Sequence, residues 1–132
     1  MINRPRIVFR GGSRTNQALT PRRGSDTAAP AGLTPGLSVE DTLKDALDSG
    51  NKKAQKLDLS KLRWPLAYFP DNPEAEGARR GHGVITPVDD KGRVDLVALE
   101  EWASCRLSQA DTPHPLTQLI IDTIVESDVR RT

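Results

Sequence analysis

Arg10 is the residue of this sequence with the clearest need for an anionic partner, because it ends a short apolar segment and is followed by Gly11 and Gly12. An arginine fork and glycine amides both donate hydrogen bonds to phosphate oxygens, so this group suits a pyrophosphate. A glycine pair after a strand is also an ordinary turn signal. The sequence therefore leaves two interpretations open for the two glycines, a phosphate contact or a turn.

Ser38, Glu40 and Asp41 form a second group with two possible roles. The hydroxyl of Ser38 could hold a ribose or nicotinamide group, and an acid beside it could stabilise a positively charged sugar in a transition state. The same residues are typical of a helix start, with serine as the N-cap and acids in the first turn. The local pattern favours the helix, which we expect to end at Gly50.

The histidines and the cysteine give weaker signals. His82 lies between two glycines at the start of a strand candidate, where it could act as a base, donate to a ligand or close a strand edge. His114 lies between two prolines, in a loop that leads into a helix, and we do not expect it to be catalytic. Cys105 is expected to be a small buried apolar residue. These three residues have no metal-ligand spacing, so we expect no metal site.

Motifs of the common enzyme classes are missing. The sequence contains no nucleophile elbow, no Walker loop and no strand-GxGxxG-helix fingerprint. Catalysis by serine, histidine and aspartate is compatible with the composition, but no motif selects the residues that would perform it.

Short strands and separate helices must position these residues. The segment 6–10 predicts a strand that carries Arg10 to the mouth of a loop, and 56–59, 66–69 and 82–86 are further strand candidates. Asp95 caps a helix with apolar positions 96, 99, 102, 103 and 107. Pro115 starts another helix, whose apolar positions run on through Ile124.

These elements predict a single α+β domain, residues 1–132, that ends in a pair of helices. Residues 1–5 are expected to be loop or flexible. Residues 13–36 are rich in Thr, Pro, Gly, Ala and Arg and have no helical or strand period, which indicates either disorder or a binding loop.

Charge is distributed unevenly along the 132 residues, although the formal net charge is only +1. The first 23 residues contain no acid and six arginines, namely Arg4, Arg6, Arg10, Arg14, Arg22 and Arg23. Such an arm can attract RNA or another anionic partner, so a non-enzymatic RNA- or protein-binding module is one hypothesis. The first apolar run is too short for a signal peptide and no run is long enough to span a membrane, so we expect a cytoplasmic protein with no membrane partner.

Four short motifs occur in a fixed order along residues 6–90: IVFRGG at 7–12, LTPR at 19–22, GLSV at 36–39 and GHGVITP at 81–87. Their order resembles the type six exported effector two toxins, which are small bacterial toxins with an ADP-ribosyltransferase-like fold. It is also similar to the tips of Rhs-type polymorphic toxins. The resemblance implies a small ADP-ribosyltransferase-like domain.

The resemblance also implies a function and a site. The protein would be a toxin or effector in the cytosol of a target cell, transferring ADP-ribose from NAD to a protein or RNA, with an immunity protein or antitoxin as partner. A secretion system such as type VI could deliver it without a cleaved signal peptide. NAD would be held by Arg10, Gly11, Gly12 and Ser38. Catalysis would fall to Ser38, Glu40 and His82.

The chain departs from the family's pattern at one position. Classical transferases of this fold have a catalytic glutamate on a late strand, and some toxin relatives have it two positions after the histidine, where this chain has Val84. The acids that could replace it are Glu40, Glu74 and Glu76.

Overall fold

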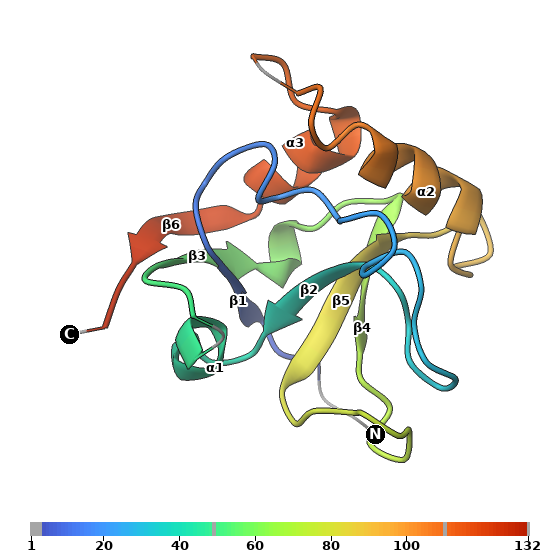
Figure 1. Ribbon diagram of the computed structural model, residues 1–132, viewed down its shortest axis with the longest axis horizontal. Helices are drawn as coiled ribbons and strands as arrows, with labels where there is room; N and C mark the ends of the chain where they lie inside the picture. Colours follow the sequence, from blue (N-terminus) through green and yellow to red (C-terminus); the bar gives the residue numbers. More distant parts are fainter. Residues whose placement is uncertain (1–3, 49, 110, 132) are drawn as a thin grey trace.

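The computed structural model describes residues 4–48, 50–109 and 111–131. Within these ranges the chain forms one six-stranded sheet with three short α-helices packed around it (Figure 1). The expected α+β class is thus confirmed. The loop expected at 1–5 lies partly outside the described residues, which begin at Arg4.

The sheet is antiparallel throughout, and its strands lie in the order β4-β5-β2-β1-β3-β6. The strands span Ile7–Gly11 (β1), Leu37–Glu40 (β2), Ala54–Asp58 (β3), Leu66–Pro70 (β4), His82–Pro87 (β5) and Ile124–Val129 (β6). The strands expected at 6–10, 66–69 and 82–86 are confirmed apart from their end residues, whereas β3 begins before the predicted start at 56.

The helices span Leu43–Asp48 (α1), Leu96–Ser104 (α2) and Pro115–Ile121 (α3), and one turn of 3-10 helix, η1, covers Leu59–Lys61. Among the described helices, none combines the length and the apolar character needed to cross a lipid bilayer. The starts of α2 and α3 agree with the sequence, since Asp95 caps α2 and Pro115 is the first residue of α3.

The prediction that Ser38 caps a helix with Glu40 in its first turn is wrong, because both residues lie in β2. The residues that alternate with them are almost fully buried, so this segment has the period of a strand. Helix α1 begins further along the chain. There the hydroxyl of Thr42 makes the capping contact, accepting the backbone N–H of Asp45 at 3.1 Å.

The domain does not end in the predicted pair of helices, because α3 is followed by strand β6. Helix α3 ends at Ile121, and Ile124 begins β6, which pairs with the outer edge of β3. That edge offers backbone groups in need of partners, and an extended segment satisfies them. Two of the apolar positions expected for α2 do not pack in the core, since Leu96 is 57% exposed and Leu107, which lies beyond the helix, is 77% exposed.

The two faces of the sheet are covered by different helices. Val8 belongs to a large core that includes Trp102 of α2 and Ile120 of α3, all fully buried. Phe9, the next residue of β1, packs instead with α1 in a smaller cluster that contains Leu47. This division follows from the alternation of side chains along a strand.

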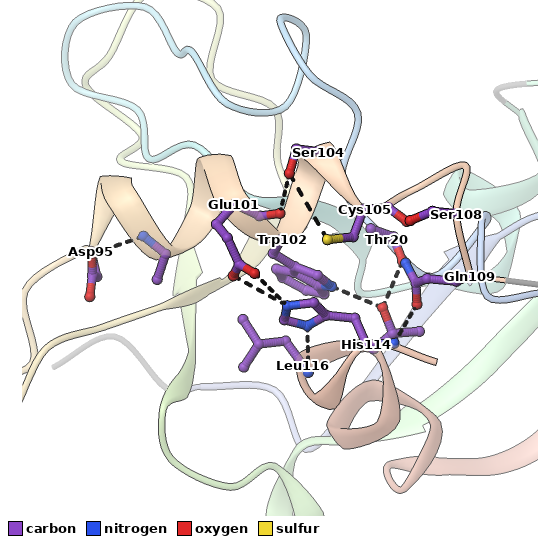
Figure 2. A network of polar contacts seen from close by, with 12 residues as sticks. Thr20, Asp95, Glu101, Trp102, Ser104, Cys105, Ser108, Gln109, His114 and Leu116 are labelled. Carbon is purple, nitrogen blue, oxygen red and sulfur yellow. Dashed lines mark hydrogen bonds and ion pairs between the residues drawn. The ribbon is translucent and has the colours of Figure 1, made fainter. Parts of the chain in front are cut away.

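The long loop 13–36 contains no helix or strand, as expected, but residues 19–20 are built into the core. Leu19 and Thr20 are fully buried. The hydroxyls of Thr20 and Thr117 lie 2.6 Å apart, Gln109 Nε2 donates to Thr20 Oγ1 at 2.9 Å, and Trp102 Nε1 donates to Thr117 Oγ1 at 2.9 Å. Figure 2 shows Thr20, Trp102 and Gln109 converging at this network. The loop is therefore attached to both α2 and α3.

We expect Thr117→Val to lower the free energy of unfolding by about 1–3 kcal/mol, because it leaves the buried indole N–H of Trp102 without its acceptor. Urea denaturation followed by tryptophan fluorescence measures the change. Thr112→Val is the matched control, since Thr112 is exposed, and it should stay within about 0.5 kcal/mol of wild type. Equal stability of the two variants would mean that the network contributes little.

Candidate functional site

Strands β2 and β5 bring together the three residues predicted to be catalytic. In their antiparallel register Ser38 lies opposite Val84, and Glu40 lies opposite His82. Because side chains two residues apart on a strand share a face, Ser38, Glu40 and His82 lie on the same face of the sheet. The sequence motifs that contain them are far apart along the chain, and the strand pairing makes them neighbours.

His82 is held between an acid and a hydroxyl. Its Nδ1 lies 2.8 Å from Asp71 Oδ1, and its Nε2 lies 3.1 Å from Ser38 Oγ. An ionised carboxylate only accepts hydrogen bonds, so the geometry assigns the proton to Nδ1 and leaves Nε2 to accept the hydrogen of the Ser38 hydroxyl. The side chains of His82 and Asp71 are 12% and 7% exposed, so water competes little for this pair.

Asp71 is the residue of this group that the sequence reasoning missed. It follows β4 directly, and β4 pairs with β5 so that Pro70 lies opposite Gly83. The backbone N–H of Asp71 donates to the carbonyl oxygen of His82 at 2.9 Å, which places the two residues face to face. The signal available in the sequence was the pair of strand candidates at 66–69 and 82–86, which would have to be paired as a hairpin.

Glu40 carries a buried carboxyl beside the same histidine. Burial raises the pKa of Glu40, and the nearby positive charge of Arg79 and the proximity of His82 oppose the shift. Arg79 Nη2 lies 3.2 Å from Glu40 Oε1, and the arginine side chain is 60% exposed. Glu40 is therefore an acid covered by a surface arginine that can turn toward solvent.

Two cavities lie beside His82 and Asp71. The larger, of about 540 Å³, is lined by Asp41, Tyr68, Asp71, Arg79, Arg80 and His82 together with prolines, Ala78 and Gly81. Among the described residues, neither Ser38 nor Glu40 is part of this lining. The smaller, of about 120 Å³, reaches Ser38 and His82 and is walled mainly by small or apolar residues. A cavity of several hundred Å³ is the size that a small-molecule ligand needs.

Arg10 reaches the loop that follows β1, as expected, and there it is engaged by backbone carbonyls. Its Nε donates to the carbonyl oxygen of Ala18 at 3.0 Å and its Nη1 to that of Ser38 at 2.9 Å. Burial lowers the pKa of Arg10, and the negative charge of Asp26 counteracts part of this shift. Within the described chain, Arg10 is not part of the lining of either cavity beside His82.

The guanidinium of Arg10 acts at the point where two strands separate. The register of β1 and β2 contains the single pair Phe9 and Glu40, so the two strands diverge just before Arg10. Its two hydrogen bonds connect β1 to the backbone of β2 and to the loop at Ala18. Arg10 therefore holds the strand that carries Ser38.

Gly11 and Gly12 are engaged inside the protein. A Cβ atom at Gly11 would lie 2.6 Å from the backbone carbonyl oxygen of Ala46 and would also meet the side chain of Asn51, so close packing against α1 requires glycine there. Gly12 has a φ of 108°, its N–H donates to the carbonyl oxygen of Lys53 at 2.8 Å, and its own carbonyl accepts from Gln55 Nε2 at 2.9 Å. The turn and packing interpretation accounts for both glycines, and a phosphate contact from the Gly12 amide would have to replace an existing hydrogen bond.

A second group of polar side chains lies on α2 and before α3. One ligand atom each from Glu101, Cys105 and His114 lie within 4.8 Å of one another, although their sequence spacing gave no sign of this (Figure 2). Cys105 is half-buried, so its prediction as a buried residue is wrong. His114 Nδ1 accepts the N–H of Leu116 at 3.0 Å, so Nε2 carries the proton and faces Glu101 at 3.2 Å. Both ring nitrogens are thus engaged, which disfavours metal ligation.

Comparison with protein-family models, curated proteins and solved structures gives no match for this chain. The functional assignment therefore depends on the residues themselves.

We expect Arg10→Ala to lower the free energy of unfolding by about 2–3 kcal/mol, because hydrogen bonds from a charged donor to two carbonyls are lost. Arg10→Lys should recover only part of this, since one ammonium cannot reproduce the planar fork. Chemical denaturation measures both. Arg14→Ala, at an exposed arginine, is the control and should leave stability nearly unchanged. If Arg10→Ala were as stable as this control, Arg10 would not hold β2 in place.

Proposed function

We propose that the protein is a toxin with an ADP-ribosyltransferase-like fold that uses NAD to modify a protein or RNA in the cytosol of a target bacterial cell. The observation that carries this proposal is the arrangement on β2 and β5. Ser38, Glu40 and His82, which belong to motifs that resemble the type six exported effector two toxins, lie on one face of the sheet, and His82 lines a cavity of about 540 Å³.

The charges around the larger cavity suit a dinucleotide substrate. Arg79 and Arg80 at its wall can bind a pyrophosphate, which is the role that the sequence had suggested for Arg10. Breaking the bond between nicotinamide and ribose develops positive charge on the sugar, and a nearby carboxylate stabilises that charge. Glu40 is a buried acid on β2, opposite His82. It would take the place of the glutamate that related toxins have at the position of Val84.

Arg79 connects the binding of the pyrophosphate with the placement of an acid at the ribose. It pairs with Glu40 at 3.2 Å and lines the larger cavity at the same time. An arginine that turns from Glu40 to a pyrophosphate would leave the Glu40 carboxylate free to face the ribose. The producing cell would need an immunity protein or antitoxin, and a cavity wall rich in charge offers such a partner a surface to cover.

We expect induced wild-type protein to arrest bacterial growth and to transfer label from radiolabelled NAD to cellular protein or RNA. Glu40→Gln should reduce label transfer by about 100-fold or more, since removing one group that stabilises transition-state charge has effects of that size. Glu126→Gln, at an exposed glutamate on β6, is the matched control and should act as wild type. Growth arrest without label would retain a toxin but reject transfer, and the absence of both would reject the proposal.

The alternative is an RNA- or protein-binding module that uses the six arginines near the N-terminus. Three of these arginines make contacts within the chain. Arg4 Nη2 donates to the carbonyl oxygen of Leu59 at 2.9 Å, Arg6 pairs with Asp58 at 3.2 Å, and Arg10 binds two carbonyls. Arg4 and Arg6 are exposed despite these contacts, and the other three arginines, Arg14, Arg22 and Arg23, are exposed as well.

Replacing these three exposed arginines with alanine separates the two hypotheses. Under the transferase proposal the triple variant still arrests growth and transfers label. RNA affinity that falls steeply with added salt in a fluorescence titration, and that disappears in the triple variant together with growth arrest, would favour the binding module.

A further inference from the structure

We propose that Ser38 is a nucleophile activated by His82 and positioned through Asp71, and that the protein has a serine-dependent acyl-transfer activity toward esters or thioesters of small acyl groups. This activity needs no NAD and goes beyond the transferase proposed above.

The three side chains form a continuous relay. Ser38 Oγ lies 3.1 Å from His82 Nε2, and His82 Nδ1 lies 2.8 Å from Asp71 Oδ1. A nucleophile within hydrogen-bond reach of a base, with the base oriented by a third group, is the arrangement by which serine hydroxyls are activated. Such a relay is recognised by geometry and roles, since unrelated folds supply its members in different orders along the chain.

Asp71 is fixed tightly enough to set the histidine tautomer. Its Oδ2 accepts the backbone N–H of Arg79 at 3.1 Å, while its own N–H donates to the carbonyl oxygen of His82 at 2.9 Å. The remaining oxygen, Oδ1, faces Nδ1 of the ring. This arrangement keeps the proton on Nδ1 and directs the lone pair of Nε2 to the hydroxyl of Ser38. Asp71 is thus a positioning residue that acts through His82.

Ser38 is held on a fixed backbone. It lies in β2, where its own carbonyl oxygen accepts from Arg10 Nη1 at 2.9 Å. A reactive group on a strand with a fixed carbonyl loses little entropy on reaching its attack geometry.

The smaller cavity indicates the size of the acyl group. It has a volume of about 120 Å³ and is reached by Ser38 and His82, with walls that include Leu33, Pro35 and Val84. Small apolar walls beside a polar hydroxyl suit a short acyl chain, with its carbonyl carbon at the hydroxyl and its methyl end against the walls. A long chain does not fit in this volume.

The proposed step balances with water as the co-reactant. Ser38 Oγ attacks the acyl carbonyl carbon and forms a C–O bond while its proton passes to His82 Nε2. The bond from the acyl carbon to the leaving alcohol or thiol then breaks, and the leaving group takes the proton from His82. Water hydrolyses the acyl-serine by the same route in reverse, with His82 as base and then as acid.

A fluorophosphonate probe, which reacts with activated serines, tests the proposal on the full chain in the absence of NAD. Mass spectrometry should find one adduct on wild-type protein, located at Ser38 by peptide mapping, and none on Ser38→Ala. Asp71→Asn should slow labelling by about 100-fold or more, because an amide no longer favours the required tautomer. Ser108→Ala, at an exposed serine on the segment after α2, is the control and should label as wild type.

Substrate size gives a second readout on wild-type protein. p-Nitrophenyl acetate should be hydrolysed at least 10-fold faster than p-nitrophenyl decanoate. Three results would overturn the proposal: no labelling of the wild-type protein, an adduct elsewhere than Ser38, or equal labelling of Asp71→Asn and wild type. The hydrogen bonds among Ser38, His82 and Asp71 would then serve only the stability of the sheet. Because these assays contain no NAD, their failure leaves the transferase proposal standing, and the reverse also holds.

Discussion

The two hydrogen bonds from the Arg10 guanidinium to backbone carbonyls are the interaction on which the rest of the site depends. They lie where β1 and β2 stop pairing, and they connect the two strands at a point where backbone hydrogen bonds no longer do so. One bond fixes the loop at Ala18 and the other fixes β2 at Ser38. A buried cation in this position needs both acceptors, because an unsatisfied guanidinium would be costly to keep away from water. Arg10 is thus a structural residue that helps to position the partly buried Ser38.

The polar residues of the candidate site come from different segments, and the pairing of strands brings them together on one face of β2 and β5. Ser38 and Glu40 come from β2, His82 from β5, and Asp71 from the turn of the β4–β5 hairpin. Each of these side chains faces a neighbour with a complementary hydrogen-bonding role. The two proposed activities share Ser38 and His82 and differ in the other residues that they use. Arg79 and Arg80 line the larger cavity, with Glu40 paired to Arg79, whereas Ser38 lines the smaller cavity.

Much of the fold could be predicted from local patterns, and the errors have a common physical origin. Apolar runs ended by glycine or proline located β1, β4 and β5, and the residues Asp95 and Pro115 located the starts of two helices. Ser38 was assigned to a helix because a hydroxyl followed by acids fits a cap as well as it fits the end of a strand. The decision between them depends on burial of the alternate residues against strands far away in sequence. The same holds for Ile124, whose extended conformation depends on the free edge of β3.

Within the candidate site, residue types pointed to Ser38, Glu40 and His82, but not to their contacts. Asp71 lies in a segment of prolines, acids and glycine that has no local signature, and only the hairpin register places it on His82. Glu101, Cys105 and His114 converge for a similar reason, since the turn between α2 and α3 folds back. Side-chain chemistry is readable in a sequence, whereas proximity across a sheet is a property of the tertiary structure.

The order of the strands determines when the site can exist. Ser38 and His82 are 44 residues apart in the chain, and β1, which supports Ser38, is completed on its other side by β3. Sheets built from such distant partners form slowly, because long loops must close before any pair is stabilised. A folding chain therefore passes through an interval in which the local β4–β5 hairpin can form but Ser38 is not yet paired with His82. The strand order therefore delays the site, which is complete only after β2 has paired with β5.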